Sequence, residues 1–245
     1  MMDFRTPYPT RRTVLRSAVG IALLASVSQA HRAAAATLKI ATIGAGNVGR
    51  ALGTVWVKSG HEVMFSSRNP EGLKSWVNDL GPSAHVGTVA EAVAFGDVIL
   101  LAVPYGALPQ LAADFAPALA GKALVMDTCN PFPDRDGAVA VAAIEKGAGR
   151  YIAELLPGAP VVRAFNAVNY RLMASGGGRP DGTLTGMPIA GDNANALALA
   201  SDLVSDVAFE PVIVGSLEFG KHLRPRQPLA GEHVPDEIRS IAATL

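Results

Sequence analysis

The strongest constraint on the fold of this chain is a G-x-G-x-x-G turn that directly follows an apolar stretch at residues 38–43. Between a strand and a helix, this spacing allows a tight turn, close approach of the backbone to a pyrophosphate, and close packing of the helix on the strand. The helix that follows would point its free N–H groups and its positive dipole end at that pyrophosphate. The motif therefore predicts a dinucleotide site. Its expected contact residues are Gly44, Gly46, Asn47, Val48 and Gly49.

The end of the next apolar run, residues 63–65, indicates which dinucleotide is bound. NAD-binding versions of this fold place an acidic residue there to hold the ribose 2′-hydroxyl. This chain has Ser66, Ser67 and Arg68 instead. A carboxylate would repel a 2′-phosphate, whereas hydroxyls and a guanidinium would bind it. The sequence therefore predicts NADP(H) as the cofactor, and the alternative for Arg68 is a solvated loop arginine.

Strand-like apolar runs alternate with helical patterns through residues 37–245. Such uninterrupted apolar strands between helices are typical of a parallel sheet that is covered on both faces. We therefore expect an α/β fold: a doubly wound parallel (Rossmann) sheet with helices on both faces and a short irregular C-terminal tail. The expected strands are residues 38–43, 62–66, 98–102, 124–127, 161–164, 187–190 and 212–214. The expected helices are residues 48–59, 71–80, 88–95, 108–118, 139–156 with a break near 147–149, 193–207 and 235–243.

In open α/β sheets, ligands bind beyond the carboxyl ends of the strands. Residues 103–105, 128–131 and 165–168 follow apolar strands and should converge there with the glycine turn. The expected further cofactor contacts are Val103, Pro104, Thr128 and Asn130. Asn166 is the best polar candidate for orienting an acceptor or a ribose, and a strand-end cap is the alternative.

Other polar and aromatic residues are weaker candidates for chemistry. Tyr105 could stack on a ring or pack on the next helix. Asp127 ends a buried strand, where it is expected to order the backbone. Cys129, the single cysteine, is expected to be a small buried residue, and it excludes an internal disulfide and a cysteine-based metal cluster. The histidines have no expected catalytic role: His61 at the far end of a strand, His85 in a connection, and His222 and His233 in the tail. We expect no metal site.

The N-terminal residues resemble an export signal rather than a part of the fold. Arg11 and Arg12 precede a short apolar, small-residue segment at residues 18–27, and small-x-small cleavage candidates follow. The paired arginines resemble a twin-arginine signal, so we expect residues 1–36 to be removed and the protein to be periplasmic or secreted. Alternatives are an uncleaved anchor or a disordered tail. After cleavage we expect no stable membrane insertion.

The charge balance gives no indication of a nucleic-acid partner. Removing five basic residues and one acid with residues 1–36 leaves 16 basic and 20 acidic residues of the original 21 of each. The expected partner is a small-molecule redox acceptor. The oligomeric state stays open, with a homodimer as one option.

Several motifs together resemble the deazaflavin-dependent NADP oxidoreductases. The N-terminal domain of that family also occurs in pyrroline-5-carboxylate reductases and, with the Ser-Arg-Asn-Pro motif, in six-transmembrane metalloreductases. The resemblance implies that NADPH passes hydride to a deazaflavin, with Ser67 and Arg68 at the 2′-phosphate and Val103 and Pro104 beside the nicotinamide. The matching segments are residues 44–49, 67–70, 102–104, 127–131 and 164–166.

One segment departs from the family pattern and leaves the acceptor open. After the sixth strand, the deazaflavin enzymes carry a histidine and a proline that help to seat the deazaflavin, whereas residues 165–169 here are Phe-Asn-Ala-Val-Asn. Residues 165–245 are expected to complete the sheet and the acceptor side of the cleft. Two functions follow: an NADP(H)-dependent oxidoreductase that reduces a flavin-like or other small acceptor, or a non-catalytic NADP-binding module with a sensing or partner-binding role.

Overall fold

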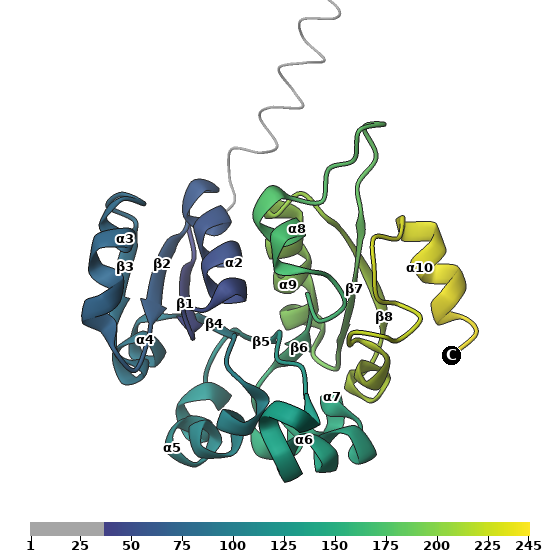
Figure 1. The fold of residues 1–245 in the computed structure, drawn as a ribbon, viewed down its shortest axis with the longest axis horizontal. Coiled ribbons are helices and arrows are strands. Elements are labelled where there is room, and N and C mark those ends of the chain that lie inside the picture. The colour runs from purple at the N-terminus through teal and green to yellow at the C-terminus, as the bar shows by residue number, and fades with distance from the viewer. Residues whose placement is uncertain (1–36) are drawn as a thin grey trace, which may run out of the picture. The chain divides into compact units, whose positions relative to one another are not determined.

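The structure, a computed structural model, describes residues 37–245; the expected export signal and its cleavage sites lie outside the described residues. The described chain folds around one eight-stranded sheet with the order β3-β2-β1-β4-β5-β6-β7-β8 (Figure 1). The expected doubly wound α/β fold is confirmed. The strands are β1 (Lys39–Ile43), β2 (Glu62–Ser66), β3 (Ala84–Gly87), β4 (Val98–Leu101), β5 (Leu124–Asp127), β6 (Val161–Arg163), β7 (Gly186–Gly191) and β8 (Glu210–Gly215).

Helices cover both faces of this sheet. In Figure 1, α2, α8 and α9 lie on one face and α5, α6 and α7 on the other. The α-helices are α2 (Asn47–Lys58), α3 (Lys74–Asn78), α4 (Val89–Phe95), α5 (Leu108–Ala120), α6 (Pro133–Lys146), α7 (Ala148–Leu155), α8 (Tyr170–Ser175), α9 (Ala194–Asp206) and α10 (Pro235–Ala242). The short 3-10 helices are η1 (Pro70–Leu73), η2 (Tyr105–Ala107) and η3 (Leu217–His222).

Strand β4 shows why its residues form a buried central strand. All four of its residues are fully buried. Val98 and Leu100 face the core beneath α2 and α9, whereas Ile99 and Leu101 face the core beneath α4, α5 and α7. Successive side chains of a strand point to opposite faces, so a strand that is covered on both faces must be apolar throughout.

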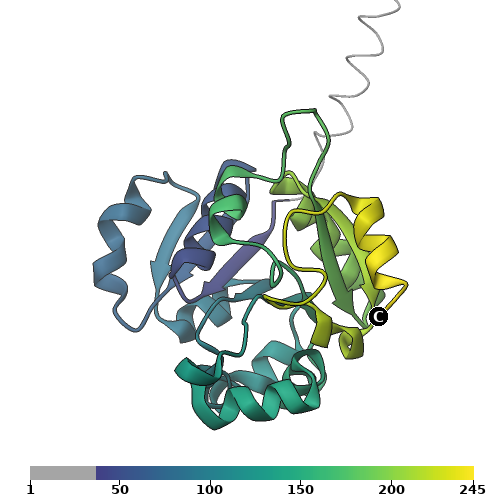
Figure 2. The ribbon, with the colours of Figure 1, turned by 45° about the vertical axis from the view of Figure 1, so that its right-hand side comes forward.

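Long-range contacts hold the helical layers together. The indole Nε1 of Trp56 in α2 donates to the carbonyl of Leu203 in α9 at 3.0 Å. The C-terminal helix α10 packs on β7 and β8 through Ile238, and Figures 1 and 2 show it at that end of the sheet. Residues 223–231 cross the end of β6, where Gly231 N donates to the carbonyl of Ala167 at 3.0 Å.

Five details differ from the sequence-based expectations. The sheet has an additional edge strand, β3, so His85 lies in a strand and not in a connection. Helix α6 begins at Pro133, earlier than expected, and α8 was not predicted. Part of the C-terminal tail that was expected to be irregular forms η3.

The fifth difference is the direction of β7, which pairs antiparallel with β6, while every other pairing in the sheet is parallel. A parallel connection needs a crossover of a dozen or more residues, usually a helix. The connection between β6 and β7, residues 164–185, is long enough for such a crossover, but its only helix, α8, has six residues and packs against α2, and the chain enters β7 from the edge at which β6 ends. The prediction of a uniformly parallel sheet was therefore wrong at this one position.

Candidate functional site

The strand register brings the predicted segments to one edge of the sheet. Ile43 at the end of β1 pairs with Ser66 of β2 and with Leu101 of β4. Leu101 pairs with Asp127 of β5, and Asp127 with Arg163 of β6. The segments that follow these five residues therefore leave the sheet side by side. The strand order reverses between β1 and β4, which is where ligands bind in open α/β sheets.

The three glycines of the first turn have different surroundings. Gly44 has a φ of +103°, and a Cβ there would lie 2.5 Å from the carbonyl oxygen of Ala102. A Cβ on Gly49 would lie 2.0 Å from the carbonyl oxygen of Gly44. A Cβ on Gly46 would meet no atom within 4 Å. Gly44 and Gly49 are thus required by the fold, whereas Gly46 borders open space, as expected where a pyrophosphate approaches the backbone.

The amino end of α2 faces this space without a side-chain partner. Gly46 is the N-cap residue, and no side chain caps the helix. The first turn of α2 contains no acidic residue. The free N–H groups and the positive dipole end are therefore available to an anion, which is the arrangement that binds pyrophosphates. The open space and the free N–H groups fit the phosphates of a dinucleotide.

Of the three residues expected to bind the 2′-phosphate at the end of β2, one is buried and two are accessible. Ser66 is fully buried, and its hydroxyl donates to the carbonyl of Thr42 at 2.8 Å, so its side chain supports the strand end and does not reach the surface. The Ser67 hydroxyl accepts from Asn69 N at 3.1 Å. Arg68 is exposed and makes no ion pair or side-chain hydrogen bond with any other residue in the range 37–245. Ser67 and Arg68 are therefore the residues with access to a ligand.

A cavity of about 280 Å³ lies beyond the ends of β1, β4 and β5. Six of the predicted cofactor residues line it: Asn47, Val48, Val103, Pro104, Thr128 and Asn130. Ser67 and Arg68 do not line it and lie at the neighbouring end of β2. The cavity therefore corresponds to the part of the cleft beyond the phosphate turn.

Sequence reasoning missed three large side chains of this cavity: Phe132, Arg135 and Tyr170. Phe132 is 43% exposed, and the guanidinium of Arg135 lies 5.0 Å from its ring centroid. Tyr170 begins α8 and is half-buried. Their positions in the sequence could have identified them, because each residue closely follows a segment, 128–131 or 165–168, that was expected at the carboxyl edge of the sheet. The cavity therefore has two aromatic rings at its border, one from the residue that precedes α6 and one from the first residue of α8.

A buried ion pair holds the segment after β5. Asp127 and Arg163 pair with each other, and both side chains are fully buried. Asp127 also accepts from Cys129 N at 2.8 Å, and Arg163 donates to the Leu223 carbonyl at 3.1 Å. Burial raises the pKa of the Asp127 carboxyl, while the Arg163 guanidinium and the Cys129 N–H oppose that shift. The expected role of Asp127 in ordering the backbone is confirmed.

The side chains of Cys129 and Thr128 are also engaged by the fold. Both the Cys129 thiol and the Thr128 hydroxyl donate to the carbonyl of Leu101, at 3.4 and 2.7 Å. Burial, followed by the nearby Asp127 carboxylate, raises the pKa of the Cys129 thiol well above its ordinary value. The thiol therefore stays protonated at neutral pH and is no activated nucleophile. Cys129 is a small buried residue, as expected.

Asn166 lies behind the cavity and not in its lining. It is 1% exposed, and its Nδ2 donates to the Cys129 carbonyl at 3.3 Å. Its own carbonyl accepts from Nδ2 of Asn130 at 2.9 Å. Phe165, just before it, has a φ of +62°, which is uncommon for a bulky residue and marks a constrained turn. Asn166 therefore does not face an acceptor directly, as was expected, and instead positions residues 129–130 through these hydrogen bonds.

The surroundings of Tyr105 and His61 show that both side chains have structural roles. Tyr105 is fully buried, its hydroxyl donates to the Ala148 carbonyl at 3.2 Å, and burial raises its pKa. It packs against the following helices and does not stack on a ligand. His61 precedes β2 at the far edge of the sheet and lies 2.9 Å from an Asp206 carboxylate oxygen, so it is a structural residue.

The described residues show neither a membrane-spanning helix nor a metal cluster. No helix within residues 37–245 has the length and apolar character that crossing a bilayer requires. No group of three or more His, Cys, Asp or Glu side chains in the same range could hold a metal ion.

Comparison with known proteins finds a matching family model and a curated relative. Residues 39–131 match the family model described as "NADP oxidoreductase coenzyme F420-dependent". The chain is 33% identical to the metalloreductase STEAP3 of Rattus norvegicus over 182 residues, which cover 73% of this chain and 34% of that protein. The chain thus spans about a third of the length of this curated relative.

Several solved structures share the fold of this chain. A hypothetical protein from Sinorhizobium meliloti aligns with a TM-score of 0.65 and 26% identity, covering 79% of this chain and 93% of that one. A protein from Arthrobacter sp. FB24, whose description proposes an F420-dependent NADP-reductase, aligns with a TM-score of 0.63 and 25% identity, covering 75% and 87%. Mycobacterium tuberculosis 3-hydroxyisobutyrate dehydrogenase shares the fold, with a TM-score of 0.56, 21% identity and coverage of 76% and 57%.

These similarities agree at the level of enzyme class. The family model describes an oxidoreductase and names NADP, and the descriptions of the rat protein and of the Arthrobacter protein name reductases. They support the expectation that this chain is an NADP-dependent oxidoreductase.

Proposed function

We propose that this chain binds NADPH across the carboxyl edge of its sheet and transfers hydride to a small acceptor in the adjoining cavity. The observation that carries this proposal is the open space over Gly46, which faces the uncapped amino end of α2. This space adjoins the cavity of about 280 Å³, because Asn47 and Val48 line that cavity. A dinucleotide whose pyrophosphate lies at the turn can therefore extend one end toward Arg68 and the other into the cavity.

The proposed cofactor contacts follow from the accessible groups. Ser67 and Arg68 bind the 2′-phosphate, since a guanidinium forms charge-assisted hydrogen bonds with phosphate oxygens. Ser66 contributes indirectly, because its hydroxyl already donates to Thr42. By family resemblance, Val103 and Pro104 lie beside the nicotinamide. Bound NADPH supplies a hydride, and a proton from solvent completes the two-electron reduction of an acceptor such as a flavin.

The cavity lining suits a reaction that depends on placement alone. Hydride transfer requires the donor and acceptor atoms to be close and aligned, with water excluded, and it needs no nucleophile. The polar groups of Thr128 and Cys129 are bonded to the protein backbone. The Phe132 ring and the Tyr170 ring border the cavity and offer stacking surfaces to a planar acceptor. A flavin or deazaflavin acceptor fits this description best.

The test is NADPH oxidation by the purified protein with flavins, a deazaflavin, quinones and ferric chelates as acceptors. We expect reduction of at least one planar acceptor, with NADPH preferred over NADH. If no acceptor is reduced while NADPH still binds, the alternative of a non-catalytic NADP-binding module replaces the oxidoreductase.

We also propose that the protein is exported by the twin-arginine route, on the basis of Arg11 and Arg12 in the sequence. Replacing both arginines with lysine should retain the protein in the cytoplasm with residues 1–36 uncleaved, as judged by cell fractionation and mass spectrometry. Unchanged recovery from the periplasm would contradict this route.

A further inference from the structure

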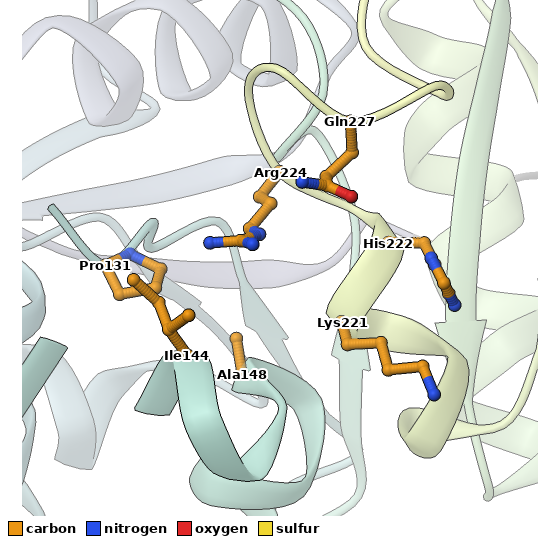
Figure 3. A pocket seen from close by; sticks show the side chains of 7 residues that line it. All are labelled: Pro131, Ile144, Ala148, Lys221, His222, Arg224 and Gln227. Carbon is orange, nitrogen blue, oxygen red and sulfur yellow. The ribbon is translucent and has the colours of Figure 1, made fainter. Parts of the chain in front are cut away.

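A second cavity, of about 210 Å³, lies on the other side of the segment that borders the cleft. Asn130 and Phe132 line the cleft, whereas Pro131 between them lines the second cavity. The two cavities therefore border the same three-residue segment, residues 130–132. Ile144 of α6 and Ala148 of α7 form an apolar wall of the second cavity, and the C-terminal tail supplies the opposite wall (Figure 3).

The tail residues of this second cavity are polar and carry excess positive charge. They are Lys221, His222, Arg224 and Gln227. In Figure 3, the Arg224 guanidinium points across the cavity toward Pro131 and the Gln227 amide lies beside it, while Lys221 and His222 extend along the other side. Arg224 and Gln227 are both half-buried, and they offer N–H donors from two side chains to one ligand.

The two permanent positive charges of this cavity have no directly paired carboxylate within residues 37–245. Neither Lys221 nor Arg224 forms an ion pair with a carboxylate in that range. The pKa of His222 is lowered from its ordinary value, first by burial and then by the positive charges of Lys221 and Arg224. A half-buried guanidinium without a counter-ion keeps its N–H donors available for charge-assisted hydrogen bonds to an anion.

The tail is firmly attached at this place, so the cavity is part of the fold. The Leu223 carbonyl accepts from the buried guanidinium of Arg163 at 3.1 Å, and Leu223 itself is fully buried. Arg163 in turn pairs with Asp127, which holds Cys129 in the wall of the cleft. The same ion pair therefore positions both the cleft wall and the residue preceding Arg224.

We propose that Arg224 and Gln227 form a binding subsite for an oxyanion, a phosphate or carboxylate group carried by the electron acceptor. This proposal rests on the proposed function: the reducible ring occupies the cleft, and its anionic substituent crosses the segment at Pro131 into the second cavity. The acceptor is then a planar ring system with an acidic side chain.

The experiment compares FMN with riboflavin, which have the same ring and differ by one phosphate. Binding to the full protein saturated with NADP⁺ is measured by quenching of flavin fluorescence, so that the dinucleotide site is occupied. We expect FMN to bind at least about 10-fold more tightly than riboflavin, as for one charge-assisted contact to phosphate. Arg224→Gln should remove this preference and leave riboflavin binding unchanged.

The matched control is Arg226→Gln. Arg226 lies two positions further along, is exposed and does not line the cavity. Both variants lose one positive charge, so a general electrostatic effect would change both equally. Retained FMN preference in Arg226→Gln, together with its loss in Arg224→Gln, supports the subsite. Equal losses in the two variants, equal binding of FMN and riboflavin by the unmodified protein, or absence of FMN binding would overturn it.

Two further measurements separate this proposal from the proposed function and from a free-anion site. NADPH-dependent reduction of riboflavin tests the oxidoreductase without the phosphate, so it can succeed when the subsite fails. If neither flavin is reduced but FMN preference still depends on Arg224, the subsite stands and the oxidoreductase proposal fails. Arg224-dependent binding of inorganic phosphate with no preference for FMN would overturn the assignment to the acceptor.

Discussion

At the β1–β2 end of the cleft, the polar groups that reach the surface are left free, whereas at the β5–β6 end most side chains are bonded to the protein, although Asn130 Oδ1, Asn166 Oδ1 and Arg163 Nε have no hydrogen-bond partner within residues 37–245. The amino end of α2 has no side-chain cap, and Arg68 has no ion-pair partner within residues 37–245. By contrast, Asp127 pairs with Arg163, and Asn130 donates to the carbonyl of Asn166. A free donor is available to a ligand, whereas a bonded donor defines the shape of a wall. The first end is therefore equipped to bind, and the second end to position.

The two ends also differ in how far apart their interacting residues lie in the sequence. The nucleotide turn is formed by the neighbouring residues 44–49. At the other end, Arg163 reaches Asp127 across 36 residues and Leu223 across 60 residues. Substitutions of the accessible residues Gly46 and Arg68 at the first end should therefore weaken ligand binding and spare folding, and substitutions of the buried pair at the second end should do the reverse.

The largest effect on binding is expected for Gly46→Val. The new side chain would occupy the open space at the turn, where the pyrophosphate is proposed to lie, and its Cβ would meet no protein atom within 4 Å. NADPH binding should be lost, as measured by calorimetry, while the circular dichroism spectrum and melting temperature stay unchanged. Gly49→Ala is the matched control, because its Cβ would lie 2.0 Å from the Gly44 carbonyl oxygen and should lower stability. Normal NADPH affinity in Gly46→Val would place the nucleotide elsewhere.

The largest effect on stability is expected for Arg163→Met, which leaves the Asp127 carboxylate buried without its partner. Breaking a buried pair in this way costs about 3–5 kcal/mol. Denaturant unfolding should report this loss, while 2′,5′-ADP, a probe of the nucleotide end, keeps its affinity for the folded protein. The double variant Asp127→Asn with Arg163→Met should recover part of the stability. A loss below about 1 kcal/mol would mean that the pair does not hold this end together.

Arg68→Ala should weaken NADPH selectively. Loss of a hydrogen bond to a charged group costs roughly 1.5–3 kcal/mol, which is about 10- to 150-fold in affinity. Because NADH has no 2′-phosphate, its affinity should remain unchanged. Arg68 is exposed and otherwise unbonded within the described range, so stability should not change. Equal losses for NADH and NADPH in calorimetric titrations would refute the assignment of Arg68 to the 2′-phosphate.

The smallest effect concerns the pH dependence of the tail. The folded-state pKa of His222 lies below its ordinary value of 6.5, so the unfolded chain takes up a proton first as the pH falls. The His222 contribution to stability is therefore intact above pH 6.5 and is lost progressively below it. Arg224→Gln removes one of the repelling charges and should raise the pKa of His222 in an NMR titration. An equal rise in Arg226→Gln would show that the effect is not local.

The sequence predicted the parts of the site that depend on neighbouring residues better than those that depend on residues distant in the chain. The roles of Gly44, Gly46 and Gly49 were predictable because each depends on neighbours within one turn and one strand end. The position of residues 103–104 and 128–130 at the cleft was predictable because carboxyl ends of parallel strands meet at one edge. The role of Asn166 was predicted at the right edge of the sheet, but its side chain lies behind the cavity.

By itself, the sequence determined the α/β fold, the dinucleotide turn and the residues expected to distinguish NADP from NAD, since these depend on periodicity and short spacing. Only the tertiary structure decided the antiparallel direction of β7, the buried pair of Asp127 and Arg163, and the cavity that Arg224 shares with α6 and α7. Each of these depends on segments that are distant in the chain. Which of these segments come together is set by packing, burial and charge compensation in three dimensions, and local sequence patterns do not predict it.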